Sequence, residues 1–161
     1  MVINSKLFIF YAFIISIFLN FIPPSFSYEK DIKLFNKIFF DVVEKDFEFK
    51  GYFPDRVRNL TSGWINNKVK ISGVDGKVSF VFFEYEEKTK LIDDGKRVDI
   101  SMSFNLNITK SSLSKKKIIQ GKVKSYGEIK GSFTLNDFDE VINNAQTELI
   151  KIFSSDIKNK I

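Results

Sequence analysis

The chain has 161 residues, with 25 Lys or Arg against 20 Asp or Glu, and it contains neither His nor Cys. The lack of His excludes imidazole bases and His-ligated metals, and the lack of Cys excludes disulfides, thiol catalysis and thiolate zinc sites. Its 19 Phe and its 43% hydrophobic residues are enough to form a core, which excludes global disorder.

The first 27 residues have the pattern of a secretory signal peptide. Lys6 precedes a predominantly apolar run from Leu7 to Ile22, and Ser25-Phe26-Ser27 supplies small residues before a cleavage site. We predict cleavage between Ser27 and Tyr28. The alternative is an uncleaved anchor in the inner membrane, although these 16 apolar-region residues would span only about 24 Å as a helix.

The pattern predicts that the chain leaves the cytoplasm. Because the sequence has no Cys, no thiol follows the signal for lipid attachment. Only Arg56, Arg58 and Arg97 are arginines, whereas nucleic-acid binding favours arginine for phosphates and bases. Export and this composition together predict no nucleic-acid partner.

The mature chain reads as a polar lead-in, residues 28–37, followed by one domain, residues 38–161. Residues 38–49 are rich in β-branched and aromatic side chains and predict a strand. Pro54 is placed to open a helix that runs to about Lys68, with Val57, Leu60 and Trp64 at helical spacing. Residues 68–72 are either the end of this helix or a short strand, and residues 73–76 form a turn.

Three further strands are predicted from period-two alternation. The first covers residues 77–89, and Asp93-Asp94-Gly95 then forms a hairpin. From Val98 to Ile108, six apolar residues alternate with polar ones, which predicts a sheet with one buried and one solvated face. After a turn at residues 111–114, residues 116–126 form the return strand.

The C-terminal region predicts a long amphipathic helix. Asn136 or Asp137 would cap it, and Asp137 with Glu140 has the spacing of a capping box. The apolar stripe consists of Phe138, Val141, Ile142, Ala145, Leu149, Ile152, Phe153 and Ile157. The order β-α-β-β-β-α predicts an α+β two-layer sandwich, in which two helices cover one face of an antiparallel sheet of about four strands.

The sequence predicts no catalytic residue, no cofactor and no metal site, and hence no enzyme. Glu84, Glu86 and Glu87 form the one tight acidic group near a core strand, and we interpret them as solvated residues of a strand that leaves the core. The Asp93-Asp94-Gly95 segment lacks the alternating oxygen ligands of a calcium loop, so it is a turn.

Lysines near the turn between the two clearest strands form the candidate site. They could dock anionic lipid headgroups or lipid-linked phosphates, or they could be solvated side chains that prevent edge pairing. This candidate docking set consists of Lys110, Lys115, Lys116, Lys117, Lys122 and Lys124.

The predicted element order, closing with the helix DFDEVINNAQTELIKIFSSDIKNKI, resembles small cell-envelope proteins of Gram-negative bacteria. These include uncharacterised alphaproteobacterial envelope proteins, which share Trp64, and the lipopolysaccharide-assembly lipoprotein of the outer-membrane translocon. The resemblance covers about residues 64–161 and departs from the lipoprotein in lacking a lipidated Cys. It implies an accessory role in outer-membrane or lipopolysaccharide assembly, with an envelope protein as partner. A periplasmic carrier that holds a lipid or other apolar ligand between sheet and helices is the alternative.

The predicted cleavage site can be tested by intact-mass analysis. We expect protein purified from the envelope fraction to begin at Tyr28, because small residues precede this position. A chain that still begins at Met1 would instead support the uncleaved anchor.

Overall fold

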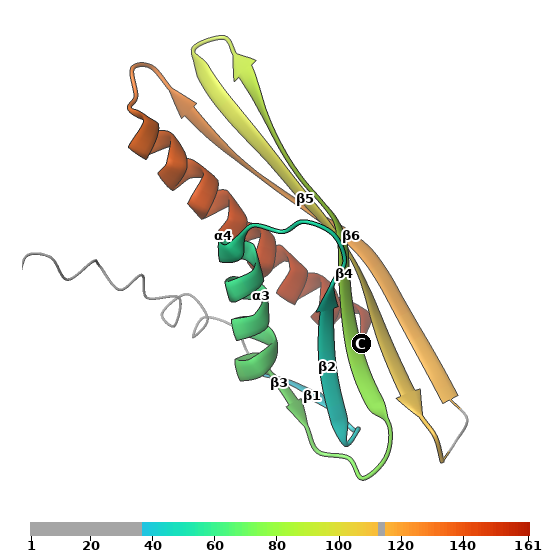
Figure 1. Ribbon diagram of the computed structural model, residues 1–161. Helices are drawn as coiled ribbons and strands as arrows, with labels where there is room; N and C mark the ends of the chain where they lie inside the picture. The colour runs from blue at the N-terminus through green and yellow to red at the C-terminus, as the bar shows by residue number, and fades with distance from the viewer. Residues whose placement is uncertain (1–36, 113–114) are drawn as a thin grey trace, which may run out of the picture.

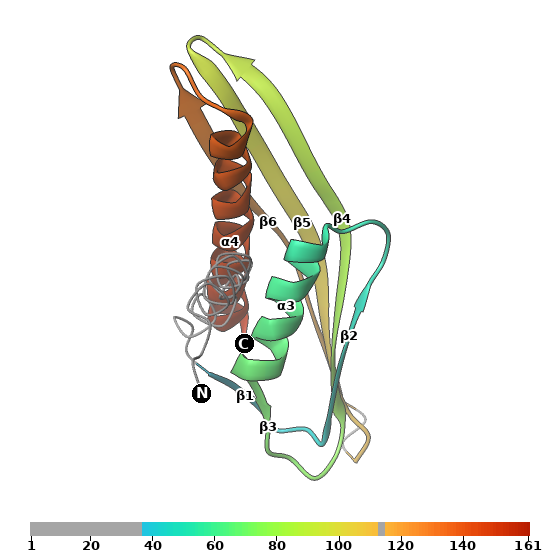
Figure 2. The same cartoon turned by 60° about the vertical axis from the view of Figure 1, so that its left-hand side comes forward.

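The computed structural model describes residues 37–112 and 115–161, so the predicted signal peptide and most of the lead-in lie outside the described residues. Two helices pack against one face of a four-stranded sheet, and no helix among the described residues covers the opposite face (Figure 1, Figure 2). The predicted α+β two-layer arrangement is therefore confirmed. We call the helix-covered face the inner face and the opposite one the outer face.

The elements follow one another along the chain as β1 (Ile38–Phe40), β2 (Glu44–Phe49), α3 (Asp55–Lys68), β3 (Val69–Ile71), β4 (Lys77–Ile92), β5 (Gly95–Lys110), β6 (Lys115–Lys130) and α4 (Leu135–Lys160). The main sheet has the order β2-β4-β5-β6, and β1 pairs with β3 in a separate two-stranded sheet. Of the three long strands, β5 is antiparallel to both of its neighbours, β4 and β6, as the alternating pattern predicted.

The prediction of one strand over residues 38–49 was wrong, because this segment forms two strands with different partners. β1 pairs with β3, whereas β2 pairs with β4. Val42, between them, is buried, and its carbonyl accepts a hydrogen bond of 3.1 Å from the Gly73 amide. A Cβ atom on Gly73 would lie 2.5 Å from the Val42 nitrogen, so this close approach requires glycine.

The sheet is mixed rather than purely antiparallel. β2 runs parallel to β4, and the chain between them contains α3 and β3. A parallel pair requires such a crossover connection, whereas a short hairpin suffices for an antiparallel pair. The prediction of an antiparallel sheet was therefore wrong for β2. Of the two alternatives for residues 68–72, the end of the helix or a short strand, the structure has a short strand at residues 69–71.

Helix α4 begins one turn earlier than the predicted cap at Asn136 or Asp137. The N-cap is Thr134, whose hydroxyl accepts a hydrogen bond of 3.2 Å from the Asp137 amide. The Asp137 carboxylate accepts one of 2.8 Å from the Thr134 amide in return. Asp137 is thus the acidic member of the capping box rather than its first residue, and these contacts lower the pKa of its carboxyl group.

The core is centred on aromatic rings that join both helices to the sheet. The Phe153 ring of α4 lies 4.9 Å from Trp64 of α3 and 4.9 Å from Phe104 of β5, measured between centroids. It lies 5.4 Å from Phe82 of β4. Perpendicular arrangements of this kind are favourable and add to the burial of apolar area. The predicted inward positions of the strands and the apolar stripe of α4 are confirmed by this packing.

An irregularity in β4 changes which side chains face inward. The register against β5 shifts between Phe83 and Glu86, and Glu84 has a left-handed backbone with φ of 53°. A bulge of this kind adds one residue to a strand and redirects its side chains. Tyr85 consequently packs on the inner face, where its ring lies 5.5 Å from that of Phe53.

Burial of the aromatic rings predicts how substitutions affect stability. We expect Phe104→Ala and Phe153→Ala each to lower the free energy of unfolding by about 3–5 kcal/mol, because both remove a buried ring. The matched control is Phe39→Ala, since the Phe39 side chain is 64% exposed and its loss should change stability by less than about 0.5 kcal/mol. Denaturant unfolding measures all three; equal losses would contradict the one-sided core.

Candidate functional site

The outer face of the sheet carries a channel of short side chains along β5. Ser101 and Ser103 lie on this face, since their neighbours Ile100, Met102 and Phe104 point into the core. The two serines are nevertheless only 8% and 5% exposed. Longer side chains of β4 and β6 flank them on both sides, so the centre of the face is recessed.

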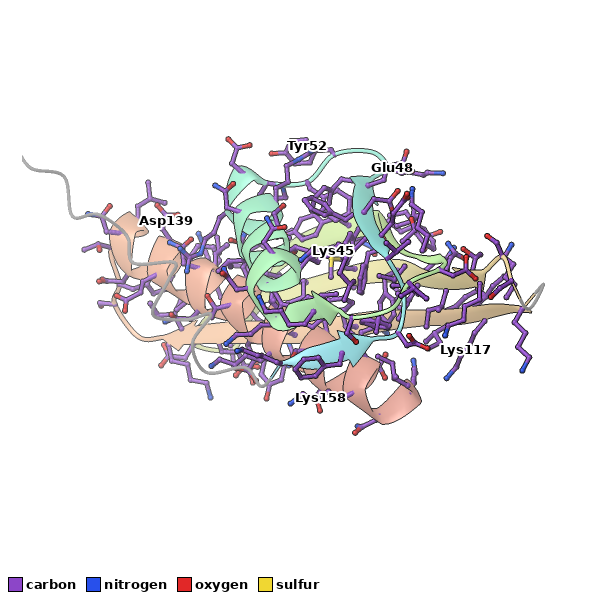
Figure 3. All side chains as sticks on the ribbon, turned by 90° about the horizontal axis from the view of Figure 1, so that it is seen from below. Lys45, Glu48, Tyr52, Lys117, Asp139 and Lys158 are labelled. Carbon is purple, nitrogen blue, oxygen red and sulfur yellow. The ribbon has the colours of Figure 1, made fainter. Side chains whose placement is uncertain are left out.

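Two lysines of the candidate docking set are engaged within the fold. Lys110, at the end of β5, forms an ion pair with Asp41, which connects the sheet to the segment between β1 and β2. Lys117 lies on β6 (Figure 3), and its Nζ donates a hydrogen bond of 3.1 Å to the main-chain oxygen of Ile161, just after α4. A positive charge is favourable at the C-terminus of a helix.

Lys115 and Lys116 lie at the beginning of β6 and are exposed. Lys115 stands opposite Lys110, and Lys116 stands opposite Thr109 on the outer face. Two like charges in directly opposed positions destabilise a sheet, and the ion pair of Lys110 with Asp41 offsets this repulsion.

Lys122 and Lys124 lie farther along the outer face. They stand opposite Ser103 and Ser101, about 20 Å or more from Lys116 along the strand. The pKa of Glu86, across the channel on β4, is lowered chiefly by its hydrogen bond with Lys88 and further by the charges of these two lysines. The docking set is therefore not one compact patch: two lysines lie at the sheet end and two lie over the channel.

A hollow of about 350 Å³ lies at this part of the outer face. It is lined by Glu86, Lys88, Arg97, Asp99, Ile100, Ser101, Lys124, Ser125 and Tyr126. Tyr126 is 60% exposed, and the Arg97 guanidinium lies 4.2 Å from the centroid of its ring. This cation–π contact holds the tyrosine ring at the edge of the hollow.

Ion pairs across three strands form one wall of the hollow. The Asp99 carboxylate forms ion pairs with Lys90 at 2.5 Å and with Arg97 at 2.6 Å. Arg97 also forms an ion pair with Glu128 at 3.0 Å. Hydrogen bonds from Lys90 and then Arg97 lower the pKa of the Asp99 carboxyl group. The same hydrogen bond with Asp99 raises the pKa of Arg97.

The three glutamates of β4 do not converge on one site. Glu84 accepts a hydrogen bond of 2.9 Å from Ser103 on the outer face, and Glu86 pairs with Lys88. Glu87 faces the other way and accepts a hydrogen bond of 2.7 Å from the Tyr85 hydroxyl. Burial, and then this carboxylate, raise the pKa of Tyr85. Within residues 37–112 and 115–161, no cluster of three acidic residues could hold a metal ion.

Sequence reasoning did not identify Arg97, Asp99 or Tyr126 as surface features of interest. The sequence feature that could have located Asp99 is the hairpin at Asp93-Asp94-Gly95. This turn fixes the register of β5 against β4 and so places Asp99 opposite Lys88. The position of Tyr126 opposite Asp99 follows from the β5–β6 register, which only the structure supplies.

The comparisons with known proteins concern the fold. No family model and no curated protein matches the chain. A solved structure similar to it is the minor lipoprotein from Acinetobacter baumannii, with 12% identity and a TM-score of 0.50, covering 73% of this chain and 93% of that one. Rare lipoprotein B from Shewanella oneidensis has 7% identity and a TM-score of 0.49, covering 73% of this chain and 96% of that one. At this identity the likeness to the Acinetobacter protein shows a shared fold.

The described part of the chain was also searched for membrane-spanning helices. Neither α3 nor α4 is long and apolar enough to cross a membrane. The predicted apolar segment at residues 7–22 lies outside the described residues.

The ion pairs of Asp99 predict a pH dependence of stability. Its folded-state pKa is depressed, so its contribution is present at neutral pH and is lost as pH falls through the acidic range. We expect Asp99→Asn to lower the free energy of unfolding by about 0.5–1 kcal/mol at neutral pH, since the group is partly exposed.

This difference should persist down to the ordinary Asp pKa of about 3.9 and shrink only as pH falls through the depressed folded-state pKa of Asp99, where the unmodified protein becomes protonated as well. Denaturant unfolding at a series of pH values measures it. Asp93→Asn, in the exposed hairpin turn, is the control and should show no such dependence. A constant Asp99→Asn effect at every pH would contradict the electrostatic explanation.

Proposed function

We propose that this chain is an exported, non-enzymatic accessory protein of the Gram-negative cell envelope, which acts by contact in outer-membrane or lipopolysaccharide assembly. The supporting observation is the fold, which it shares with the minor lipoprotein from Acinetobacter baumannii over 73% of its length. The N-terminal sequence pattern agrees with export. The chain would reach the membrane through proteins or surface charge, because it has no Cys for lipid attachment.

The exposed lysines are the means of contact in this proposal. Lys115 and Lys116 extend from the end of the sheet, and Lys122 and Lys124 extend from its outer face. Lysines at a negatively charged surface contribute about 1 kcal/mol each. An anionic lipid surface or lipopolysaccharide is therefore the natural ligand for the end formed by Lys115, Lys116 and Lys117.

A non-enzymatic role agrees with the arrangement of the acidic groups. Glu84 is bonded to Ser103 and Glu86 to Lys88 on the outer face, and Glu87 lies on the inner face, so the three carboxylates do not converge on one point. Catalysis by paired carboxylates requires two groups that reach the same substrate.

The carrier alternative has less support from the packing. An apolar ligand between sheet and helices would need the space that the rings of Trp64, Phe82, Phe104 and Phe153 occupy. All four rings are nearly or completely inaccessible to solvent, and the other three each contact Phe153. A carrier would have to displace contacts that stabilise the fold.

The docking role of the sheet end is tested by removing its charge. We expect Lys115→Gln, Lys116→Gln and Lys117→Gln together to weaken binding to vesicles containing phosphatidylglycerol by about tenfold at low salt. The loss is modest because Lys117 is already held by the Ile161 oxygen and because each lysine contributes only about 1 kcal/mol. Vesicle co-sedimentation and the same assay with lipopolysaccharide aggregates measure it.

Two controls make the result specific. The variant Lys50→Gln, Lys70→Gln, Lys130→Gln removes the same charge from dispersed positions and should bind almost as well as the unmodified protein. Binding should also fall between about 0.01 M and 0.15 M salt, because the Debye length shrinks over this range. If the two triple variants bind equally, the end of the sheet is ordinary solvated surface.

A further inference from the structure

Both edges of the main sheet are open. β2 and β6 are its outermost strands, and within the described residues neither has a strand on its far side. Figure 1 looks toward the β2 edge, and Glu48 of β2 and Lys117 of β6 lie on opposite edges of the sheet in Figure 3. Unpaired backbone groups at such edges readily accept another strand.

The outer-face charges of the two edges have opposite signs. β2 presents Glu44, Asp46 and Glu48 at every second position. β6 presents Lys116, Lys122 and Lys124 on the same face, with Ile118 and Gln120 between them. One edge of the sheet therefore carries the charge pattern that complements the other.

The direction of the free backbone groups on β2 follows from its bonds to β4. The Glu44 amide donates to the Gly76 oxygen at 3.2 Å, and the Lys50 amide donates to the Phe82 oxygen at 2.8 Å. Even-numbered residues of β2 thus bond to β4. Adjacent residues of a strand direct their backbone amides and carbonyls to opposite neighbours within the sheet. The amides and carbonyls of Lys45 and Phe47 therefore face the open edge.

The free groups on β6 follow from the hairpin register. The pair Ile92–Gly95 closes the β4–β5 hairpin, so odd-numbered residues of β5 bond to β4 and even-numbered ones bond to β6. The Gly131 amide accordingly donates to the Asp94 oxygen at 2.8 Å. Even-numbered residues of β6 therefore face the open edge, and Lys160 donates a hydrogen bond of 3.2 Å to one of their carbonyls, that of Gln120.

From these features we propose that β2 of one copy of the chain pairs, in parallel, with β6 of the next copy, so that the sheet continues from molecule to molecule. In a parallel pair, a residue whose backbone groups hydrogen-bond to the neighbouring strand stands opposite a residue of that strand whose own backbone groups point away from the interface. Even-numbered residues of β6 then stand opposite even-numbered residues of β2. Both sets lie on the outer face, so all helices remain on one side.

Charge selects the register and disfavours other pairings. With Asp46 beside Lys122 and Glu48 beside Lys124, two pairs of opposite charge form across the interface, which stabilises neighbouring strands. A symmetric pairing of β6 with β6 would place lysines opposite lysines. An antiparallel pairing of β2 with β6 would match outer positions with inner ones and put the helices of the two copies on opposite faces.

The helices leave room for this pairing. Each helix occupies about 10 Å across the sheet, which equals two strands about 4.8 Å apart, so two helices span four strands in every copy. A groove of about 500 Å³ lies beside α4; it is lined in part by Gly127 and Glu128 of β6 and by Asn144 and Glu148 of α4. Helix α4 contacts β6 from the inner face, since a Cβ atom on Gly127 would lie 2.5 Å from the Val141 side chain.

The proposed interface joins two different edges, β2 of one copy and β6 of the next. Each added copy therefore presents the same free edge again. Such a head-to-tail contact produces an open-ended row rather than a closed dimer. This inference goes beyond the proposed function, and the charge pairs that it predicts do not include Lys115, Lys116 or Lys117. Failure of the vesicle experiment would leave it unaffected, and its own failure would leave the docking role unaffected.

Engineered cysteines test the interface, because the chain has none of its own. The full-length chain carrying Glu48→Cys and Lys124→Cys would be expressed in a Gram-negative host and examined on non-reducing gels after export. Neighbouring strands bring Cα atoms to the distance a disulfide requires. We expect a ladder of covalent dimers, trimers and larger species, and only dimers when the two single variants are coexpressed.

The matched control combines Glu48→Cys with Lys116→Cys, which lies eight residues away on β6, or about 26 Å along the strand. It should remain monomeric. A ladder of equal strength from the control, or no ladder from Glu48→Cys with Lys124→Cys, would overturn the proposed register.

Exchange of the charges tests the interface without cross-links. Chains with Asp46→Lys and Glu48→Lys, or with Lys122→Glu and Lys124→Glu, should each sediment as monomers, because like charges then face each other at both charged positions of the interface. An equimolar mixture should associate again, as opposite charges are restored. Unmodified protein that remains monomeric at every concentration, or variants that associate as it does, would overturn the proposal.

Discussion

The contact of Phe153 with Trp64, Phe82 and Phe104 is the interaction on which the rest of the structure depends. It is where α4, α3 and two strands of the sheet meet, and all four side chains are removed from solvent. Gly121 of β6 provides space for it, since a Cβ atom there would lie 2.6 Å from the Phe104 ring. Because all of this packing is on one face, the opposite face remains free of helices (Figure 2).

The position of β2 depends on a second contact, made by Lys45. This residue lies between β2 and α3 (Figure 3), and its Nζ donates hydrogen bonds to the carbonyls of Val69 at 3.0 Å and Ile65 at 3.3 Å. The contact satisfies carbonyls at the end of α3. Burial, and then the charge of Lys70, lower the pKa of Lys45. With Lys45 turned inward, Glu44 and Asp46 on either side of it must face outward.

A one-sided core supports the proposal that this molecule acts by contact. The outer face carries scattered apolar side chains such as Ile118 and Tyr126, and its recessed serines, ion pairs and lysines are compatible with water. Its interactions with other molecules would therefore depend on charge and on the free edges of the sheet. The lysines at the sheet end, residues 115–117, take no part in the proposed pairs, which use Lys122 and Lys124, so both kinds of contact can exist in one protein.

The sequence alone predicts the elements whose pattern is local. The alternation from Val98 to Ile108 and the helical spacing in residues 55–68 and 138–157 identify β5, α3 and the core face of α4, because burial of one face leaves a period in the chain. The two-layer fold follows from these periods. The candidate lysines are also visible in the sequence, though not their separation into distinct groups.

Tertiary structure alone decided the features that depend on distant partners. The break between β1 and β2, the parallel pairing of β2, and the ion pair of Lys110 with Asp41 each join segments far apart in the chain. Residues 38–49 have the composition of one strand, and nothing within them states that β3 binds one half and β4 the other. The physical reason is that a strand's pattern records which of its faces is buried, whereas its backbone hydrogen bonds are the same for every partner, so the sequence carries little record of the neighbour.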